Sequence, residues 1–272
     1  INILQAYHIH YDPCPILVVQ PTVDDAKGYS KDEIQPMLRD IPVLRNLVSS
    51  AKSRDSNNTI EKKNFPGGNL TLVGANSARG FRRLSVRIVL FDEVNGYPPS
   101  AGQEGDQIQL GITRTETFWN RKIVIGSTPT VEPSRISDSY NESDGGVYLV
   151  PCPHCDHYHE LEFKNLKWDD GLPNTARFMC PECGSLIDHK HKVDMVTKGF
   201  WQGSTWSYRD GKFTFDDNFS GHIGFKIWAA YSYSPNSSWS ELVKVFLAVK
   251  DNPDTLKTYV NTVLGEDWKE LE

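Results

Sequence analysis

Two short cysteine motifs constrain the fold of this chain more than any other feature of its sequence. The first is Cys152-Pro-His-Cys155 and the second is Cys180-Pro-Glu-Cys183, with 24 residues between them. Each Cys-x-x-Cys turn offers two thiolates, and two such turns complete the tetrahedral ligand set that Zn²⁺ prefers. We therefore predict a zinc-ribbon-like module in which Cys152, Cys155, Cys180 and Cys183 bind zinc. Since four thiolates leave no open coordination position, this zinc would be structural.

Free structural thiols are the alternative to zinc at these four positions. A disulfide framework is disfavoured, because the chain is long and its first residues do not form a secretion signal. The fifth cysteine, Cys14, stands alone. The histidines close to the motifs are expected to be surface or packing residues, not ligands: His154, His157 and His159.

Short apolar runs alternate with helical stretches in the first half of the chain. Residues 16–19, 86–91 and 122–125 are rich in apolar side chains, as expected of strands that are covered on both faces. Residues 58–64 and 69–75 are expected to form a hairpin joined at Gly67-Gly68. Strands separated by helical stretches favour an α/β sheet.

Helices are predicted over residues 1–11, 30–48 and 253–264, and from Ser237 onward. For the second helix, Ser30 is the predicted cap with Glu33 three residues later, and the predicted breaks are at Pro36 and Pro42. The helix that begins near Ser237 would bury one apolar face, made of Leu242, Val245, Phe246 and Val249.

An apolar strand that ends in two carboxylates is the first candidate for catalysis. The segment Arg87-Ile-Val-Leu-Phe-Asp-Glu93 follows the Walker B pattern, in which the strand carries its acidic residues to the ligand-binding edge of the sheet. Asp92 would hold Mg²⁺, and Glu93 would polarise the water that attacks the γ-phosphate of ATP. The alternative is an ordinary strand that ends in acidic turn residues.

A second buried strand ends in small hydroxyl residues. Within Ile123-Val-Ile-Gly-Ser-Thr-Pro129, we expect Ser127 and Thr128 to contact Glu93 or the γ-phosphate and to relay the nucleotide state. A plain strand-to-turn transition is the alternative. The order of this motif after the Asp-Glu strand favours a motor-type ATPase core.

An arginine cluster precedes the Asp-Glu strand, and guanidinium groups suit a charged phosphoryl transition state. A solvated basic loop or a DNA-facing patch is the alternative. The cluster contains Arg79, Arg82, Arg83 and Arg87.

Composition limits the function classes further. The net charge is −6 over 272 residues, so overall charge does not support nucleic-acid binding, and no apolar run is long enough to span a membrane. Aromatic residues between Phe225 and Trp239 are expected to anchor the following helix to the core, although base stacking is conceivable.

Taken together, these segments resemble the large terminase subunits of lambda-like phages, the GpA type. The matching stretches are Val19-Gln-Pro-Thr22, Leu38-Arg-Asp-Ile-Pro42, Val86 to Val94 with Tyr97-Pro98, Gly126-Ser-Thr-Pro129, Cys152-Pro-His-Cys155, Ile227-Trp-Ala-Ala-Tyr231 and Asn261 to Trp268.

This resemblance implies an α/β fold with a RecA-like P-loop ATPase core over residues 1–146, truncated at its N-terminus. It further implies a zinc-ribbon-like insertion over residues 147–221 and C-terminal helices over residues 222–272 that lead to a nuclease domain. The family's Walker A loop would precede the first helix, so we expect the chain to be an excised fragment with little activity of its own. Arg79 and Arg82 are equal candidates for the family's arginine finger.

The implied activity is ATP hydrolysis that drives double-stranded DNA into a procapsid. ATP and Mg²⁺ are the implied cofactors, and Zn²⁺ is the cofactor that the cysteine motifs predict. The implied partners are phage DNA, the small terminase subunit and the portal of the procapsid, with an oligomeric motor in the cytoplasm of the bacterial host. The alternatives are a helicase-type nucleic-acid translocase and a non-enzymatic zinc-ribbon binding module.

Overall fold

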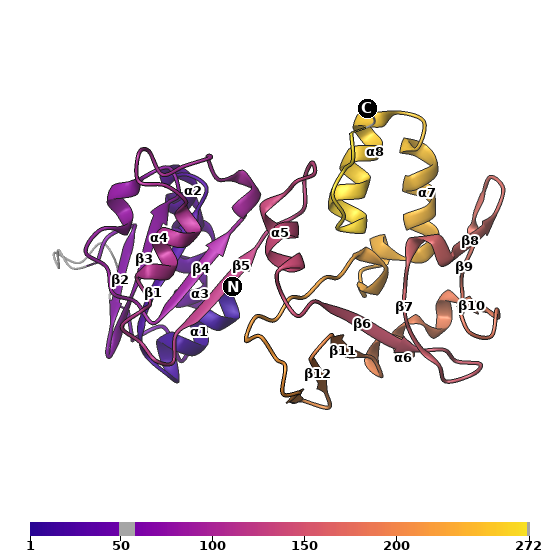
Figure 1. Ribbon diagram of the computed structural model, residues 1–272, viewed down its shortest axis with the longest axis horizontal. Helices are drawn as coiled ribbons and strands as arrows, with labels where there is room; N and C mark the ends of the chain where they lie inside the picture. The colour runs from indigo at the N-terminus through magenta and orange to yellow at the C-terminus, as the bar shows by residue number, and fades with distance from the viewer. Residues whose placement is uncertain (49–57, 271–272) are drawn as a thin grey trace. The chain divides into compact units, whose positions relative to one another are not determined.

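A computed structural model describes residues 1–48 and 58–270 of the chain (Figure 1). Two compact units make up the protein, Ile1–Ser127 and Thr128–Glu272. The division falls between the two hydroxyl residues of the Gly-Ser-Thr-Pro motif, before the predicted boundary at residue 146. Because this division follows spatial contacts only, the three-part division at residues 146 and 221 stays a prediction.

The first unit is built on a five-stranded sheet with the order β2-β3-β1-β4-β5. Four of its strands are parallel, and β2 (Lys62–Phe65) pairs antiparallel with β3 to form the predicted hairpin. The parallel strands are β1 (Pro15–Gln20), β3 (Gly68–Gly74), β4 (Ile88–Asp92) and β5 (Lys122–Gly126). The predicted α/β sheet is therefore confirmed.

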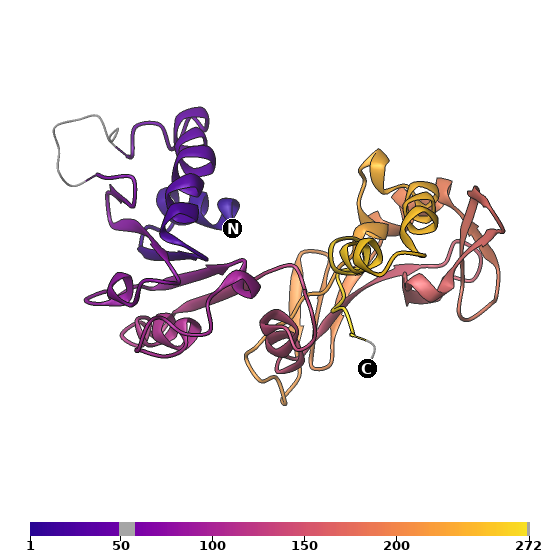
Figure 2. The same ribbon diagram turned by 90° about the horizontal axis from the view of Figure 1, so that it is seen from above.

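Helices cover both faces of this sheet, which explains why β1 and β4 consist almost wholly of buried apolar residues. One face packs against the first helices, with Ile9, Ala26 and Ile34 in the same core cluster as β1 and β4 (Figure 2). On the other face, a Cβ atom at Gly111 would lie 2.5 Å from the ring of Phe91, so only glycine lets α4 approach β4 this closely. The helices are α1 (Asn2–His10), α2 (Val23–Tyr29), α3 (Gln35–Asp40) and α4 (Gln107–Thr113).

The prediction for the second helix was wrong at its start. The helix begins after Thr22, whose side chain accepts from the backbone N–H of Asp25 while the Asp25 carboxylate accepts from the backbone N–H of Thr22. Ser30 lies inside the helix, where a π-helical turn (Ser30–Ile34) joins α2 to α3, and its hydroxyl donates to Ile60 O at 2.5 Å. Both pairs have the capping-box spacing, so spacing alone could not choose between them.

The proline breaks in this helix were half right. Pro36 lies in the first turn of α3, directly after the π-helical turn, and it does not interrupt the helix. The helix ends at Asp40, because the residue before a proline avoids the α conformation and Ile41, which precedes Pro42, is extended.

The second unit contains two antiparallel sheets, with the orders β13-β12-β11-β6-β7 and β10-β9-β8. The first comprises β6 (Gly146–Pro151), β7 (Tyr158–Glu160), β11 (Phe200–Gly203), β12 (Trp206–Arg209) and β13 (Lys212–Phe215). The second comprises β8 (Leu166–Asp169), β9 (Leu172–Met179) and β10 (Leu186–Asp188). None of the predicted helices falls on these strands.

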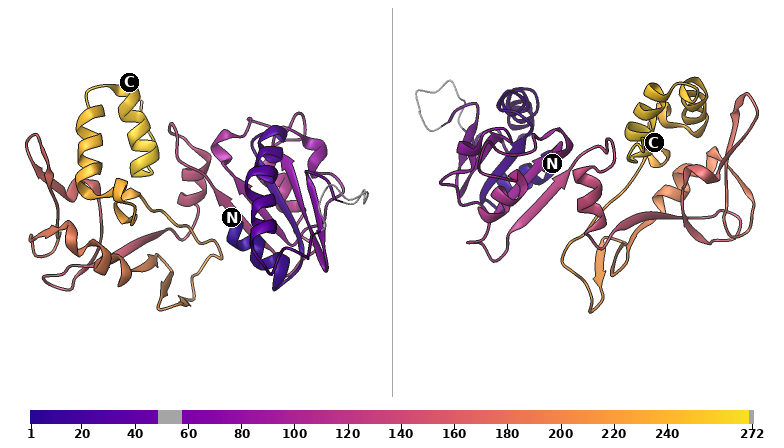
Figure 3. Two further views of the ribbon diagram at one scale, coloured as in Figure 1. Left: turned by 180° about the vertical axis from the view of Figure 1, so that it is seen from behind. Right: turned by 45° about the horizontal axis from the view of Figure 1, so that its top comes forward.

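Helices flank these sheets, and the last two lie side by side (Figure 3), with the Tyr259 hydroxyl donating to Leu242 O at 3.1 Å. They are α5 (Arg135–Asn141), α6 (Lys192–Thr197), α7 (Trp239–Val249) and α8 (Pro253–Tyr259), which continues as a π-helical turn (Val260–Leu264). The predicted apolar face of α7 was wrong at Val245, which is 44% exposed. In the part of the chain that the structure describes, no helix is both long and apolar enough to cross a bilayer.

The aromatic tract before α7 does anchor this helix, as predicted. Trp239 is fully buried and packs edge-on against Phe178 of β9, with ring centroids 4.8 Å apart. The Tyr231 hydroxyl donates to Tyr148 O and accepts from Leu161 N, which ties the tract to the larger sheet. Phe225, by contrast, is 53% exposed.

Candidate nucleotide and metal sites

The carboxyl ends of β1 and β4 bring two polar side chains together at one edge of the parallel sheet. Gln20 ends β1 and Asp92 ends β4, and the side-chain amide of Gln20 donates to Asp92 Oδ2 at 2.8 Å. Gln20 is buried, so its amide has little freedom to turn away. One carboxylate oxygen of Asp92 is thus held in place. The other oxygen makes no hydrogen bond to any residue that the structure describes.

Glu93 follows directly and leaves the strand direction. Its backbone has φ 52° and ψ 49°, the left-handed conformation, which costs a residue other than glycine on the order of 1 kcal/mol. This turn carries the Glu93 side chain toward β5, where the Ser127 hydroxyl donates to Glu93 Oε2 at 3.3 Å. Ser127 Oγ also accepts from the backbone N–H of Asn95 at 3.3 Å. The strained conformation therefore places the carboxylate against the end of β5.

The structure thus brings Asp92, Glu93 and Ser127 to one sheet edge, as their strand ends predicted. Thr128 is exposed and is the first residue of the second unit. The roles given to these four residues stay predictions.

The predicted arginine cluster separates into different environments. Arg82 donates to the Glu104 carboxylate through both Nε and Nη2, and this hydrogen bond raises its pKa. Arg79 lies exposed in a short 3₁₀ turn (Ala78–Phe81) and makes no ion pair with any described residue. Arg87 belongs elsewhere, because its guanidinium donates to the Asp12 carboxylate at the opposite end of the strands. Arg79 and Arg82 therefore stay the candidates for an arginine finger.

Two residues that support this edge escaped the sequence analysis. Gln20 ends an apolar strand, and in the sequence it looks like the first residue of a turn. Its hydrogen-bond partner on β4 could therefore not be predicted. Tyr97 is buried, and its hydroxyl donates to Val19 O at 2.8 Å, which ties the loop after β4 to β1. The Tyr97-Pro98 pair was among the stretches that resemble the family, but the resemblance suggested no role for Tyr97.

The four motif cysteines converge in the second unit. Their sulfurs all lie within 4.8 Å of one another, with Cys152 Sγ 3.9 Å from Cys183 Sγ and Cys155 Sγ 3.8 Å from Cys180 Sγ. A zinc ion with Zn–S bonds of about 2.3 Å places neighbouring sulfurs about 3.8 Å apart in a regular tetrahedron. None of the four forms a disulfide. Their arrangement fits a tetrahedral metal ion.

The two motifs adopt the same backbone conformation. In the first, the N–H of Cys152 donates to His157 O, and the N–H of Asp156 donates to Cys152 O. In the second, Cys180 N donates to Ser185 O, and Gly184 N donates to Cys180 O. Asp156 and Gly184 both have positive φ, at 59° and 69°. Each motif therefore forms a complete knuckle between two antiparallel strands, β6 and β7 for one and β9 and β10 for the other.

Local electrostatics differ between the thiols. Hydrogen bonds from the side chain and backbone of Ser185 lower the pKa of Cys183 to about 6, which favours the thiolate that a metal binds. Burial raises the pKa of Cys152. A metal ion would keep the Cys152 thiol ionised against this effect of burial.

The histidines near the knuckles lie outside this ligand group, as predicted. Among the described residues, the group with metal-ligand geometry here contains cysteines only. His159 is buried, and burial lowers the pKa of its imidazole. It is therefore a neutral packing residue in the core of this unit.

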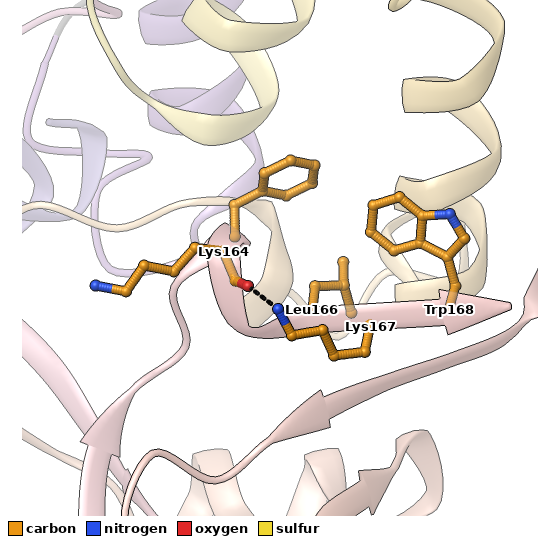
Figure 4. Close-up of a pocket in the computed structure, with 5 residues that line it drawn as sticks. Lys164, Leu166, Lys167 and Trp168 are labelled. Carbon is orange, nitrogen blue, oxygen red and sulfur yellow. Dashed lines mark hydrogen bonds between the residues drawn. The ribbon is translucent and has the colours of Figure 1, made fainter. Parts of the chain in front are cut away.

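The second unit also has an open depression on its surface (Figure 4). It is lined by Phe163, Lys164, Leu166, Lys167 and Trp168. Lys167 Nζ donates to Lys164 O at 2.6 Å, and Lys164 pairs with Glu162 at 2.7 Å. The Phe163 and Trp168 rings pack against Phe246 of α7. Its aromatic side chains thus pack against α7 and its lysines are paired within their own segment, so we assign it no ligand.

The sheet edge and the cysteine cluster both lie within one family match. Residues 1–201 match the family model described as phage terminase large subunit gpA, ATPase domain. The chain belongs to the gpA family of phage terminase large subunits. Residues 222–272 match the model of the gpA endonuclease domain, over the segment that we predicted to be the helical end of the ATPase region. The boundary between the two gpA domains stays a prediction.

Individual relatives agree with this family. The large terminase subunit of Enterobacteria phage P21 is 32% identical over 284 residues, which cover 98% of this chain and 44% of the relative. That of Escherichia phage lambda is 30% identical over 282 residues, which cover 97% of this chain and 43% of the relative. The chain therefore spans less than half the length of these curated gpA relatives.

A solved structure is also similar, at a greater distance. It is the large terminase ATPase domain of Thermus phage P74-26, with a TM-score of 0.48 and 12% sequence identity. The match covers 98% of this chain and 82% of that chain.

Proposed function

We propose that this chain supplies ATP hydrolysis for a phage DNA-packaging motor. The observation that carries this proposal is the cluster at the sheet edge, where Gln20 holds Asp92 and Ser127 contacts Glu93 within the segment that matches the gpA ATPase model. Ligands of parallel α/β sheets bind at this edge, outside the carboxyl ends of the strands.

The carboxylates fit a magnesium nucleotide by their chemistry. Mg²⁺ prefers oxygen ligands and usually keeps several waters, so the free oxygen of Asp92 would hold it directly or through water. The metal would neutralise charge on the phosphate oxygens when bound. Glu93 would orient the attacking water and take its proton. Ser127, through its hydrogen bond to Glu93, would respond to which nucleotide is bound.

Zinc would serve the second unit as a structural cross-link. The sulfur separations and the paired knuckles support a tetrahedral ion held by Cys152, Cys155, Cys180 and Cys183. The ion would hold the β6–β7 hairpin against the β9–β10 hairpin, and the four sulfurs leave it no position for a substrate.

The partners follow from the family to which the chain belongs. We propose double-stranded phage DNA as the substrate that is moved, and the small terminase subunit and the portal of the procapsid as protein partners. The active form would be an oligomer in the cytoplasm of the bacterial host. The longer protein would also contain the gpA endonuclease activity.

The two alternatives have less support. Residues 128–270 do not form the second RecA-like domain of a helicase-type translocase, because their sheets are antiparallel. A non-enzymatic zinc-ribbon module would leave the Gln20–Asp92 and Ser127–Glu93 contacts without a purpose.

The test is ATP hydrolysis by the full-length protein with Glu93→Gln, measured with and without double-stranded DNA. The amide cannot accept the proton of the attacking water, so we expect turnover to fall at least a hundredfold while a fluorescent ATP analogue still binds. Glu116→Gln, at an exposed glutamate of the same unit, is the matched control. Wild-type turnover in the Glu93 variant would overturn the assignment of the catalytic base.

A further inference from the structure

A few residues after Ser127, the chain forms hydrogen bonds with a segment of the second unit that is distant in the sequence. Thr130 O accepts two hydrogen bonds, one from the backbone N–H of Trp268 at 2.8 Å and one from the Asn261 side-chain amide at 2.7 Å. The N–H of Glu132 donates to Trp268 O at 3.0 Å. These bonds make a short parallel bridge between Val131 and Trp268.

Side chains reinforce this bridge at both ends. The Ser134 hydroxyl donates to Asp267 Oδ1 at 2.6 Å, and Ser134 also caps α5 by accepting from Ser137 N. The amide of Asn261 makes a second bond, to Glu266 O at 2.8 Å. Asn261 and Ser134 are both buried, so these polar groups have no water to replace a lost partner.

The turn that brings residues 266–268 beside residues 130–132 requires glycine at position 265. Gly265 has φ 66°, and a Cβ atom there would lie 3.2 Å from Ile227 O. Glycine adopts this conformation freely and ends the π-helical turn that follows α8. The backbone then runs directly to Trp268 and its bonds with residues 130–132.

We infer that Asn261 and Asp267 are positioning residues that connect the hydrolysis site to the endonuclease-matched part of the chain. Residues 130–134 begin three residues after Ser127, and apart from the bonds of Ser134 within α5 their partners lie in the segment that matches the gpA endonuclease model. A displacement of Ser127 on loss of the γ-phosphate would therefore be transmitted through Thr130 to residues 261–268. This inference rests on the proposed function, because it assumes that Ser127 responds to the nucleotide.

The prediction is a loss of coupling without a loss of hydrolysis. In full-length protein with its packaging partners, Asn261→Ala and Asp267→Ala should keep ATP turnover without DNA within twofold of wild type. The length of DNA packaged per ATP should fall at least fivefold. Asp267→Asn keeps the oxygen that accepts from Ser134 and should restore coupling. Asp251→Ala, at an exposed turn residue, is the control.

The outcomes separate this inference from the proposed function. Absence of ATP turnover in the wild-type protein contradicts the proposed function itself. Wild-type DNA transport per ATP in both alanine variants contradicts the inference alone.

Amide hydrogen exchange in the wild-type protein tests the inference even when a variant misfolds. In the wild-type protein, a non-hydrolysable ATP analogue should change the exchange rates of the Glu132 and Trp268 amides at least threefold. Rates that do not respond to nucleotide, although the analogue binds, would overturn the inference.

Discussion

Gln20 and Asp92 lie on neighbouring parallel strands, and the amide of the first donates to the carboxylate of the second at 2.8 Å. The bond fixes the carboxylate before any cation arrives. Its geometry depends on the register of β1 against β4, in which Val19 lies beside Phe91. The candidate magnesium ligand is therefore oriented by the sheet itself.

Removal of the hydrogen bond between Gln20 and Asp92 should lower the apparent affinity of the protein for Mg²⁺ in ATP hydrolysis. We expect Gln20→Ala to raise the Mg²⁺ concentration needed for half-maximal ATP hydrolysis by about 10- to 100-fold, the usual effect of losing a group that orients a metal ligand. Titration of hydrolysis with Mg²⁺ at saturating ATP measures this shift. Gln109→Ala, at an exposed position of α4, is the control. An unchanged titration curve in the Gln20 variant would show that Asp92 needs no such support.

The two arginine candidates should differ in their effect on turnover. Arg82 is already engaged by Glu104, whereas Arg79 is exposed and available to a phosphate. We therefore expect Arg79→Ala to lower kcat for ATP by about a thousandfold, the scale of losing an arginine finger, and Arg82→Ala to lower it by less than tenfold. Steady-state ATPase assays of the full-length variants decide between them. If Arg82→Ala lowers kcat more than Arg79→Ala does, Arg82 is the arginine finger. Its ion pair with Glu104 would then have to break when nucleotide binds.

The cysteine cluster should bind one zinc ion per chain. We expect elemental analysis to find one zinc in the wild-type protein and none in Cys152→Ser, because three thiolates hold zinc far more weakly than four. The metal-free variant should lose amide exchange protection in β6, β7, β9 and β10, since binding free energy at such a site contributes to folding. Cys14→Ala, outside the cluster, should keep its zinc. A zinc-free wild-type protein with intact protection would contradict the structural role.

Lys192 should give the second unit a measurable dependence on pH. It is 3% exposed, its Nζ donates to Ser237 O at 2.9 Å, and burial lowers its pKa from 10.5 to about 8. Between these values the unfolded chain carries a proton that the folded protein lacks, so the free energy of unfolding rises with pH in this window. From pH 8 to pH 10 the gain is up to about 3 kcal/mol.

Denaturant unfolding of wild-type protein and Lys192→Met at both pH values measures this contribution. The variant cannot lose a proton at residue 192, so its stability should rise less than that of the wild type over the same interval. Equal changes in the two proteins would mean that Lys192 stays charged in the fold.

Local patterns were sufficient to predict the sheet strands and the knuckles. The apolar runs at β1, β4 and β5 have few alternatives to a buried strand, and the cysteine spacing has few alternatives to a metal-binding turn. The ends of β4 and β5 also placed Asp92, Glu93 and Ser127 at the sheet edge. These features depend on residues close together in the chain.

Features that depend on distant residues could not be predicted. The contact between Gln20 and Asp92 joins residues 72 positions apart, and the bond from Asn261 to Thr130 O joins residues 131 positions apart. Each requires the tertiary register of two elements, which no local pattern contains. The false cap at Ser30 has the opposite cause, since Thr22 and Ser30 present the same local spacing and only the core decides that Ser30 is buried.

The equivalence of the two knuckles has a consequence for the order in which the second unit assembles. Each knuckle closes its backbone hydrogen bonds within six residues, Cys152 to His157 and Cys180 to Ser185. Loops this short close in well under a microsecond, so both thiols of a pair are presented together before the sheets have formed. Capture of the proposed zinc ion would then require one encounter between the two preformed knuckles, and the entropy cost of closing the 24 residues between them grows only slowly with their number. The proposed ion would thus act as a nucleus for the surrounding strands during synthesis of the chain.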